Sequence, residues 1–280
     1  MRLLGVGDNV VDRYNDRGLM FPGGNALNVA VAAGRAGAEA AYIGAIGTDR
    51  AGDVVLAGLR AEGLDISRAR VVEGPNAYAD VTVVEGDRVF VGSDVGVSRF
   101  RLDADDLAYA GTFDLIHTGD CSMLEDQVAD LAAAAPVSFD FSTHRERAYL
   151  EAILPSLTVA CFSASDLSEE AAFGLLADAV ARGPRLALAT RGTAPALLSD
   201  GRRMLRQRVV AAGVVDTLGA GDSFIGRFLF GAFSGEDPAF TLRAAAEAAA
   251  ATCSHYGAFG HASPLAPEFV APGATAHAAP

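Results

Sequence analysis

A short turn near residue 220 has the composition of a phosphate-binding loop that carries its own base. Gly219, Ala220 and Gly221 precede Asp222 and Ser223. Small residues let backbone N–H groups approach a ligand closely, and the free N–H groups at a helix start attract developing phosphate charge. A carboxylate at that point can accept the proton of a hydroxyl group that attacks a phosphoryl group. The alternative is that Asp222 or Ser223 only caps a helix after a tight turn.

A second group of residues near the start of the chain has the composition of a sugar-binding site. Gly24 and Asn28 follow Gly23 and are four residues apart, which places them on one side of a helix start. Glycine leaves room for a sugar ring, and an asparagine amide both donates to and accepts from hydroxyl groups. Asp8 and Asp12 can accept further hydroxyl groups. The alternatives are close helix–sheet packing for the glycines and a turn-forming role for the two aspartates.

An α/β domain would place these residues at one edge of a sheet. Strands alternating with helices favour a mostly parallel sheet that is covered on both faces. Ligands of such sheets bind beyond the carboxyl ends of the strands, and Asp8, Asp140, Thr190 and Asp216 each lie at or just after the carboxyl end of a predicted strand. Strands are predicted at 2–7, 42–46, 115–118, 137–141, 159–163, 186–190 and 214–215, and helices at 24–37, 50–62, 222–235 and 240–256.

Two further segments predict β-hairpins outside this alternation. Residues 77–92 carry valines at alternate positions on both sides of a turn at 85–87, and residues 195–210 have a similar pattern. We expect a single domain over residues 1–263, with a small β lid from about 9–22 and 76–100. The segment 264–280 is rich in Pro, Ala and Gly without periodicity, so a loose tail is expected there.

Composition excludes several classes of function. The net charge of −13 argues against nucleic acid or an anionic membrane as the main partner. All 22 basic residues are arginine, which excludes a Schiff-base lysine and the lysine of a Walker-type phosphate loop. The three cysteines lie far apart, in neither a disulfide pattern nor a zinc-ligand spacing. No apolar run of about 18 residues occurs, so we expect a cytoplasmic protein without a membrane span.

The segments 23–28 and 216–224 resemble the two signature motifs of the PfkB (ribokinase-like) carbohydrate kinases, in the same order, and the resemblance extends over about residues 2–262. It implies a ribokinase-like three-layer α/β/α fold, with a mostly parallel central sheet plus a small β-sheet lid. It also implies transfer of the γ-phosphoryl group of ATP to a sugar hydroxyl in the presence of Mg²⁺. The expected partners are therefore a small-molecule sugar and ATP, and the lid implies a homodimer.

The resemblance also assigns roles to individual residues. The catalytic base is Asp222, with an anion hole formed by the N–H groups of Gly219, Ala220 and Gly221. The sugar-binding residues are Asp8, Asp12, Gly23, Gly24 and Asn28. The residues near the ATP phosphates are Ser163, Thr190 and Gly192. A monovalent-cation site, with K⁺ as the candidate ion, is assigned to Asp216.

Two elements depart from the family pattern. Residues 163–166 read Ser-Ala-Ser-Asp where many members have an Asn-x-x-Glu element for the magnesium and phosphate network. Residues 190–195 alter the glycine spacing that is common after the threonine of the T-x-G element. Magnesium is still expected because ATP requires charge neutralisation, but the residues that organise it stay open.

Within the family, segments 7–12, 139–142 and 162–165 are most similar to the fructoselysine 6-kinases, which act on a ketose that carries an amino acid through its amine. The predicted function is therefore phosphorylation of a ketose-type substrate, fructoselysine or another fructosamine, at the 6-position. Two alternatives stay open. One is a kinase for a plain ketohexose, ribose or a nucleoside. The other is a catalytically silent sugar- or nucleotide-binding module.

Overall fold

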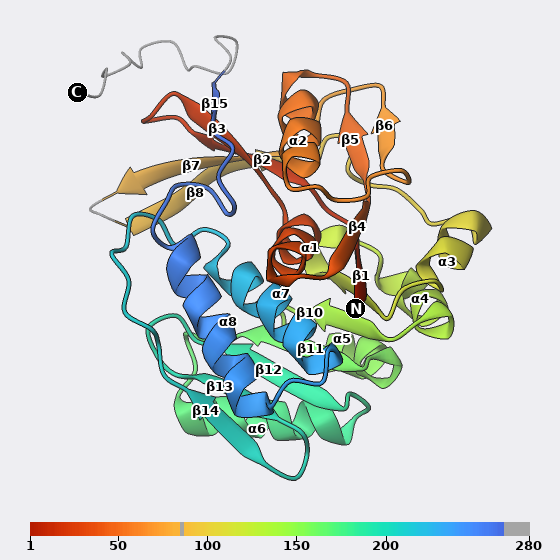
Figure 1. Ribbon diagram of the computed structural model, residues 1–280, viewed down its shortest axis with the longest axis vertical. Coiled ribbons are helices and arrows are strands. Elements are labelled where there is room, and N and C mark those ends of the chain that lie inside the picture. Colours follow the sequence, from red (N-terminus) through yellow and green to blue (C-terminus); the bar gives the residue numbers. More distant parts are fainter. Residues whose placement is uncertain (85–86, 266–280) are drawn as a thin grey trace.

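The computed structural model describes residues 1–84 and 87–265, which form two main sheets with helices around the larger one (Figure 1). The run of strands from β12 to β4 in the larger sheet is parallel, and β13 and β14 extend it as an antiparallel hairpin. This sheet and the hairpin at 195–210 agree with the predictions. In spatial order the strands are β14 (Met204–Gln207), β13 (Ala196–Ser199), β12 (Leu186–Thr190), β11 (Val159–Ser163), β10 (Val137–Asp140), β9 (Leu115–Gly119), β1 (Arg2–Val6) and β4 (Glu39–Ile43).

Helices cover both faces of this sheet because its strands are apolar on both sides. Neighbouring residues such as Leu3 and Leu4 are both fully buried, and they pack into different hydrophobic clusters on opposite faces. The first face is covered by α1 (Asn25–Ala36), α7 (Ala220–Phe233) and α8 (Pro238–Thr252), which lie side by side in Figure 1. The other face is covered by α3 (Ala104–Ala110), α4 (Val128–Ala134), α5 (Arg147–Ile153) and α6 (Glu169–Ala181). The predicted three-layer α/β/α fold is confirmed.

The second sheet, which we call the lid sheet, lies at one end of the large sheet (Figure 1). Its strands β7 and β8 pair antiparallel, which agrees with the hairpin predicted at 77–92, while residues 85 and 86 of the predicted turn lie outside the described residues. In spatial order the strands are β15 (Ser263–Pro264), β3 (Leu19–Gly23), β2 (Val10–Tyr14), β7 (Tyr78–Val84) and β8 (Asp87–Asp94). The remaining elements are α2 (Arg50–Ala61), a two-stranded sheet of β5 (Ala45–Gly47) and β6 (Arg70–Val72), and the 3-10 turns η1 (Asp120–Ser122), η2 (Glu125–Gln127) and η3 (Leu154–Ser156).

Two segments differ from the sequence-based expectation. The strand predicted at Val214 and Val215 is wrong: both side chains are exposed, and the Val215 N–H donates to the Cys253 carbonyl at 2.8 Å rather than to a neighbouring strand. Pro264, the first residue of the segment expected to be a loose tail, belongs to β15 and pairs with Leu19 of β3. Residues 266–280 of that tail lie outside the described residues. Among the described helices, none has the length and apolar character that a membrane span requires.

Helices α1 and α7 approach each other closely at Gly226. A Cβ atom placed on Gly226 would lie 2.5 Å from the Val29 carbonyl oxygen and 2.6 Å from Ala32 Cβ. Both distances are shorter than van der Waals contact, so any side chain there would push the two helices apart. This spacing matters for function because the first turns of both helices carry predicted site residues.

We expect Gly226→Ala to lower the free energy of unfolding by about 1–3 kcal/mol, because overpacking forces a shift of the helix backbone. Gly174→Ala is the matched control, since Gly174 is exposed on α6 and no atom lies within 4 Å of a Cβ atom placed on it. There the smaller backbone entropy of alanine should raise stability by about 0.5–1 kcal/mol. Urea unfolding of both variants measures the difference, and equal stabilities would contradict the close packing.

Candidate active site

The first turns of α1 and α7 meet at the carboxyl edge of the large sheet, and Asp222 lies between them. The Asn28 amide donates to Asp222 Oδ2 at 2.7 Å, and the Asn25 amide donates to Asp222 Oδ1 at 2.9 Å. Each oxygen of the carboxylate therefore has a side-chain donor that fixes its orientation. The structure thus brings together Asp222 and Asn28, which are 194 residues apart in the sequence.

The Asp222 carboxyl group has an acidity suited to a general base. Burial raises its pKa to about 6, while the amides of Asn28 and Asn25 act in the opposite direction. A group with that pKa is mostly ionised at neutral pH, yet it binds a proton more readily than an ordinary carboxylate. Asp222 is therefore ionised before the reaction and can take a proton from a hydroxyl group during it.

The turn before α7 requires glycine at Gly219. Its φ of 71° lies in the left-handed region, and a Cβ atom on it would lie 2.4 Å from Ala258 Cβ. The Ala220 N–H donates to the Thr217 carbonyl at 3.3 Å. Within the described part of the chain, the N–H groups of Gly221 and Asp222 have no backbone acceptor, so they are free to bind an anion at the helix start. The anion hole predicted from Gly219, Ala220 and Gly221 stays a prediction.

Asp8 lies at the start of α1 rather than facing open solvent. Its carboxylate accepts the N–H groups of Asn25 at 2.7 Å and Ala26 at 3.2 Å, and the Ser122 hydroxyl at 2.9 Å. Burial raises the pKa of Asp8, and these donors oppose that shift. Gly24 has a φ of 118°, and a Cβ atom on it would lie 2.7 Å from Asn9 Cα. Asp8 therefore helps to hold the glycine turn in place.

Asp12 lies on β2 of the lid sheet, next to the glycine turn. A Cβ atom on Gly23 would lie 2.4 Å from Asp12 Oδ2, so a side chain there would displace the Asp12 carboxylate where the lid sheet meets α1. The Asp12 side chain is buried. The structure therefore places Asp12, Gly23 and Gly24 in one region beside the first turn of α1. Their predicted contact with a sugar stays a prediction.

The residues predicted near ATP follow β11 and β12. Ser163 and Thr190 are paired in the parallel register of these strands, and a Cβ atom on Gly221 would lie 3.9 Å from Thr190 Oγ1. Gly192 has a φ of 58° and is exposed next to Ser165. An exposed, left-handed turn beside the start of α7 fits a phosphate-bearing ligand, because its backbone can approach the ligand closely.

The altered element at residues 163–166 contains an ion pair with Arg145. Asp166 accepts from both terminal nitrogens of Arg145, at 2.7 and 3.0 Å, and Arg145 also donates to the Ser163 carbonyl at 3.0 Å. The guanidinium group holds the pKa of Asp166 below its usual range. Asp166 is thus held in an ion pair. Over the residues that the structure describes, no cluster of three or more His, Cys, Asp or Glu side chains could hold a metal ion.

Asp216 lies apart from Asp222, between the lid sheet and the loop before α7. It accepts from the Tyr14 hydroxyl of β2 and from the N–H groups of Leu218 and Gly257, the latter two both at 3.1 Å. The Asp216 side chain is buried. The predicted monovalent-cation role of Asp216 stays a prediction.

Three residues at the site were not assigned roles from the sequence. Asn25 donates to Asp140 Oδ2 at 2.8 Å as well as to Asp222, and His117 Nε2 lies 3.4 Å from the side-chain oxygen of Asn25. Asn25 lies three residues before Asn28, which places both on the same side of a helix, so helical spacing could have indicated it. Asp140 was visible only as a polar residue at a strand end.

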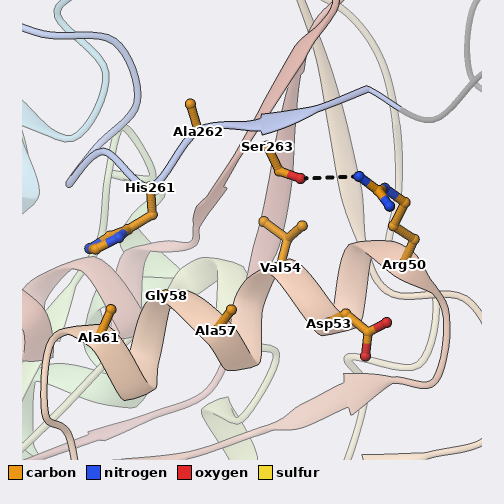
Figure 2. Close-up of a pocket in the computed structure, with 9 residues that line it drawn as sticks. All are labelled: Arg50, Asp53, Val54, Ala57, Gly58, Ala61, His261, Ala262 and Ser263. Carbon is orange, nitrogen blue, oxygen red and sulfur yellow. Dashed lines mark hydrogen bonds between the residues drawn. The ribbon is translucent and has the colours of Figure 1, made fainter.

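Two cavities lie near these elements. One of about 480 Å³ lies between α2 and the segment before β15, where Arg50 donates to Ser263 Oγ at 3.5 Å (Figure 2). It contains none of the predicted site residues. The other, of about 430 Å³, lies between α1, α7 and α8 and reaches Asn28 and Ser223. The strand-end polar residues, rather than the larger cavity, therefore define the candidate active site.

The chain is similar in sequence to curated kinases. It is 46% identical to Fructosamine kinase FrlD of Bacillus subtilis (strain 168) over 269 residues, which cover 94% of this chain and 95% of that protein. It is 34% identical to Fructoselysine 6-kinase of Escherichia coli (strain K12) over 256 residues, 91% of this chain and 98% of that protein. Among solved structures, Arabidopsis thaliana ribokinase complexed with ribose and ATP has a TM-score of 0.78 at 20% identity, covering 92% of this chain and 94% of that one.

The family model described as pfkB family carbohydrate kinase matches residues 5–264. This match confirms the predicted family and the predicted class of enzyme, a phosphotransferase with an alcohol group as acceptor. Members of the family use a sugar and ATP as small-molecule partners, with a divalent metal ion. The chain belongs to the pfkB family of carbohydrate kinases.

Proposed function

We propose that this protein transfers the γ-phosphoryl group of ATP to the 6-hydroxyl group of a fructosamine. The observation that supports this best is the 46% identity to Fructosamine kinase FrlD over 94% of this chain. The site supports it as well, because Asp8, Asp120, Asp140 and Asp222 lie close enough for their charges to interact. Such a cluster of carboxylates favours an acceptor that carries a positively charged amine.

In the proposed reaction, Asp222 accepts the proton of the sugar hydroxyl as its oxygen forms a bond to phosphorus and the bond to the ADP oxygen breaks. When bound, ATP supplies the phosphoryl group, and Mg²⁺ neutralises part of its charge. The free N–H groups at the start of α7 stabilise the negative charge that remains. Since Asp166 is paired with Arg145, we expect magnesium to be held mainly by phosphates and water.

The proposed sugar contacts come from the start of α1 and from β2. Asn28 is buried, and its Oδ1 atom has no hydrogen-bond partner within the described residues, so it can accept a sugar hydroxyl. Asp12, Gly23 and Gly24 lie beside it, while Asp8 holds the turn. Ser163, Thr190 and Gly192 are the proposed contacts to ATP.

Two further proposals concern the lid sheet. Asp216 joins β2 to the loop before α7 through Tyr14, and a K⁺ ion bound at Asp216 would tie the position of the lid sheet to that loop.

The second proposal is a homodimer that forms through the lid sheet. Two exposed apolar side chains support it: Val91 on β8 and Val95 just beyond the end of that strand. Closure of the lid sheet over the sugar would exclude water, which competes as phosphoryl acceptor.

Measuring ADP release against a panel of acceptors tests the proposed function. We expect kcat/KM for fructoselysine to exceed that for fructose, ribose and adenosine by at least about 10-fold, because an acceptor that lacks the amine forgoes the attraction between its positive charge and the carboxylate cluster. A higher value for fructose, ribose or adenosine would favour a plain sugar or nucleoside kinase. Binding of these ligands without any ADP release would favour a catalytically silent module.

A further inference from the structure

Asn25 connects Asp222 to a second buried carboxylate. Its side-chain nitrogen donates to Asp140 Oδ2 at 2.8 Å and to Asp222 Oδ1 at 2.9 Å. An asparagine amide has two N–H bonds, so each carboxylate receives one of them. Asp140 also accepts the Ser142 N–H at 2.9 Å, which fixes its other oxygen. The two carboxylates are therefore held apart and oriented by one amide group.

His117 contacts the oxygen end of this amide. Its Nε2 lies 3.4 Å from Asn25 Oδ1, and its Nδ1 lies 3.2 Å from the Ser138 hydroxyl. Burial lowers the pKa of His117 to about 3, so the ring is neutral. A carbonyl oxygen can only accept, which assigns the ring proton to Nε2 and makes Nδ1 the acceptor of Ser138. This N–H group holds the amide oxygen of Asn25, while the amide nitrogen donates to Asp140 and Asp222.

We infer that Asn25 is a positioning residue, which holds the carboxylate of Asp222 in its reactive orientation beside Asp140, and that His117 orients Asn25. The inference rests on the proposed role of Asp222 as the base. Neither residue takes part in a covalent step. Asn25 acts through the hydrogen bond that it donates to Asp222, and His117 acts through Asn25.

The electrostatic surroundings give this network a measurable property. Burial raises the pKa of Asp140 to about 7, and the negative charge of Asp222 adds to the shift. The Asn25 amide lowers the pKa of both carboxyl groups. Loss of that amide should therefore raise the pKa of Asp222, and the base would be protonated at a higher pH.

Other titratable groups also face the two carboxylates. They are Asp8 after β1, His117 on β9, Asp120 and Cys121 in η1, and Cys161 on β11. Asp120 is itself paired with His144.

The pH dependence of kcat/KM with fructoselysine tests the role of Asn25. In Asn25→Ala we expect kcat to fall by about 10- to 100-fold, since a hydrogen bond to a charged group is lost. The acidic limb of the kcat/KM profile of Asn25→Ala should move to higher pH by about one unit. In Asp140→Asn the limb should stay within about 0.3 unit of the wild type, because Asp140, with a pKa of about 7, is already mostly protonated where Asp222 titrates. A shifted limb in one variant and an unshifted limb in the other are not expected from a general loss of structure.

His117→Gln and His117→Leu form a matched pair of variants that tests whether His117 orients Asn25. Glutamine can still present an N–H group to Asn25, so kcat should stay within about 3-fold of the wild type, whereas leucine removes the donor and should lower kcat by about 10-fold.

The outcomes of these experiments separate the inference from the proposed base. If Asp222→Asn is inactive but the acidic limb of Asn25→Ala does not move, the inference is overturned while Asp222 remains the base. A raised KM for the sugar with unchanged kcat would make Asn25 a substrate contact instead. Full turnover in Asp222→Asn would remove the proposed base itself. If Asn25→Ala does not fold, the kcat contrast between His117→Gln and His117→Leu decides, and equal kcat values in that pair would overturn the inference.

Discussion

Asp222→Asn should lower kcat by about 100- to 10,000-fold, the range that a positioned general base contributes. Asparagine has the same shape but cannot take the hydroxyl proton. The side-chain amides of Asn25 and Asn28 still hold residue 222 in place and take no part in the reaction. ATP and sugar should therefore bind with affinities close to those of the wild type. Steady-state ADP release gives the loss of turnover, and titration calorimetry gives the retained binding.

Asp178→Asn is the control for this prediction. Asp178 lies on α6, is exposed and pairs with Arg182 at 2.9 Å, and α6 covers the face of the large sheet opposite to α7. Exposed ion pairs contribute little to stability, so its kcat should match that of the wild type. If Asp222→Asn retained wild-type turnover, the assignment of the base would be wrong, whereas loss of both turnover and ligand binding would indicate a damaged site.

Gly219→Ala should lower kcat by about 100-fold, because the start of α7 would have to move by an appreciable part of an ångström. The methyl group would meet Ala258, and the left-handed backbone would be strained in addition. The free N–H groups of Gly221 and Asp222 and the carboxylate of Asp222 follow directly, so all of them would shift from their positions at the site. Kinetics and urea unfolding of the same variant measure the two effects.

Gly63→Ala separates the backbone cost from the loss of the site. Gly63 has the same φ of 71° as Gly219, but no atom lies within 4 Å of a Cβ atom placed on it. Gly63→Ala should therefore lose about 1–2 kcal/mol of stability from the left-handed conformation while kcat stays unchanged. Equal kcat values in the two variants would show that the turn before α7 tolerates movement.

The parts of the fold with short-range signals could be predicted from the sequence. The helix predicted at 24–37 corresponds to α1, since Gly24 and Gly37 mark its two ends with backbone angles that favour glycine. The buried strands could be predicted because their apolar runs face a helix layer on each side. The segment at Val214 and Val215 failed because a β-branched pair resembles a strand, whereas a strand also needs a neighbour with free backbone groups.

The site was only partly predictable for a related reason. Asp222 and Asn28 belong to local sequence motifs, so their residue types and spacing indicated them. The link between Asn25 and Asp140 depends on where β10 ends relative to α1, and the sequence does not contain that distance. The pairing of Asp166 with Arg145 likewise joins residues on two different loops. Such contacts follow from tertiary packing rather than from a local pattern.

The close packing of α1 against α7 also affects how the chain acquires its structure during synthesis. About 180 residues separate the end of α1 from the start of α7, so at 5–20 residues per second roughly 10–40 s of translation pass between them. During this time the apolar side of α1 that α7 later covers has no native partner. The edge of β3 similarly waits for β15. The nascent chain therefore exposes apolar side chains and an unpaired strand edge until almost all of it has left the ribosome. Such surfaces are bound by chaperones that act on nascent chains.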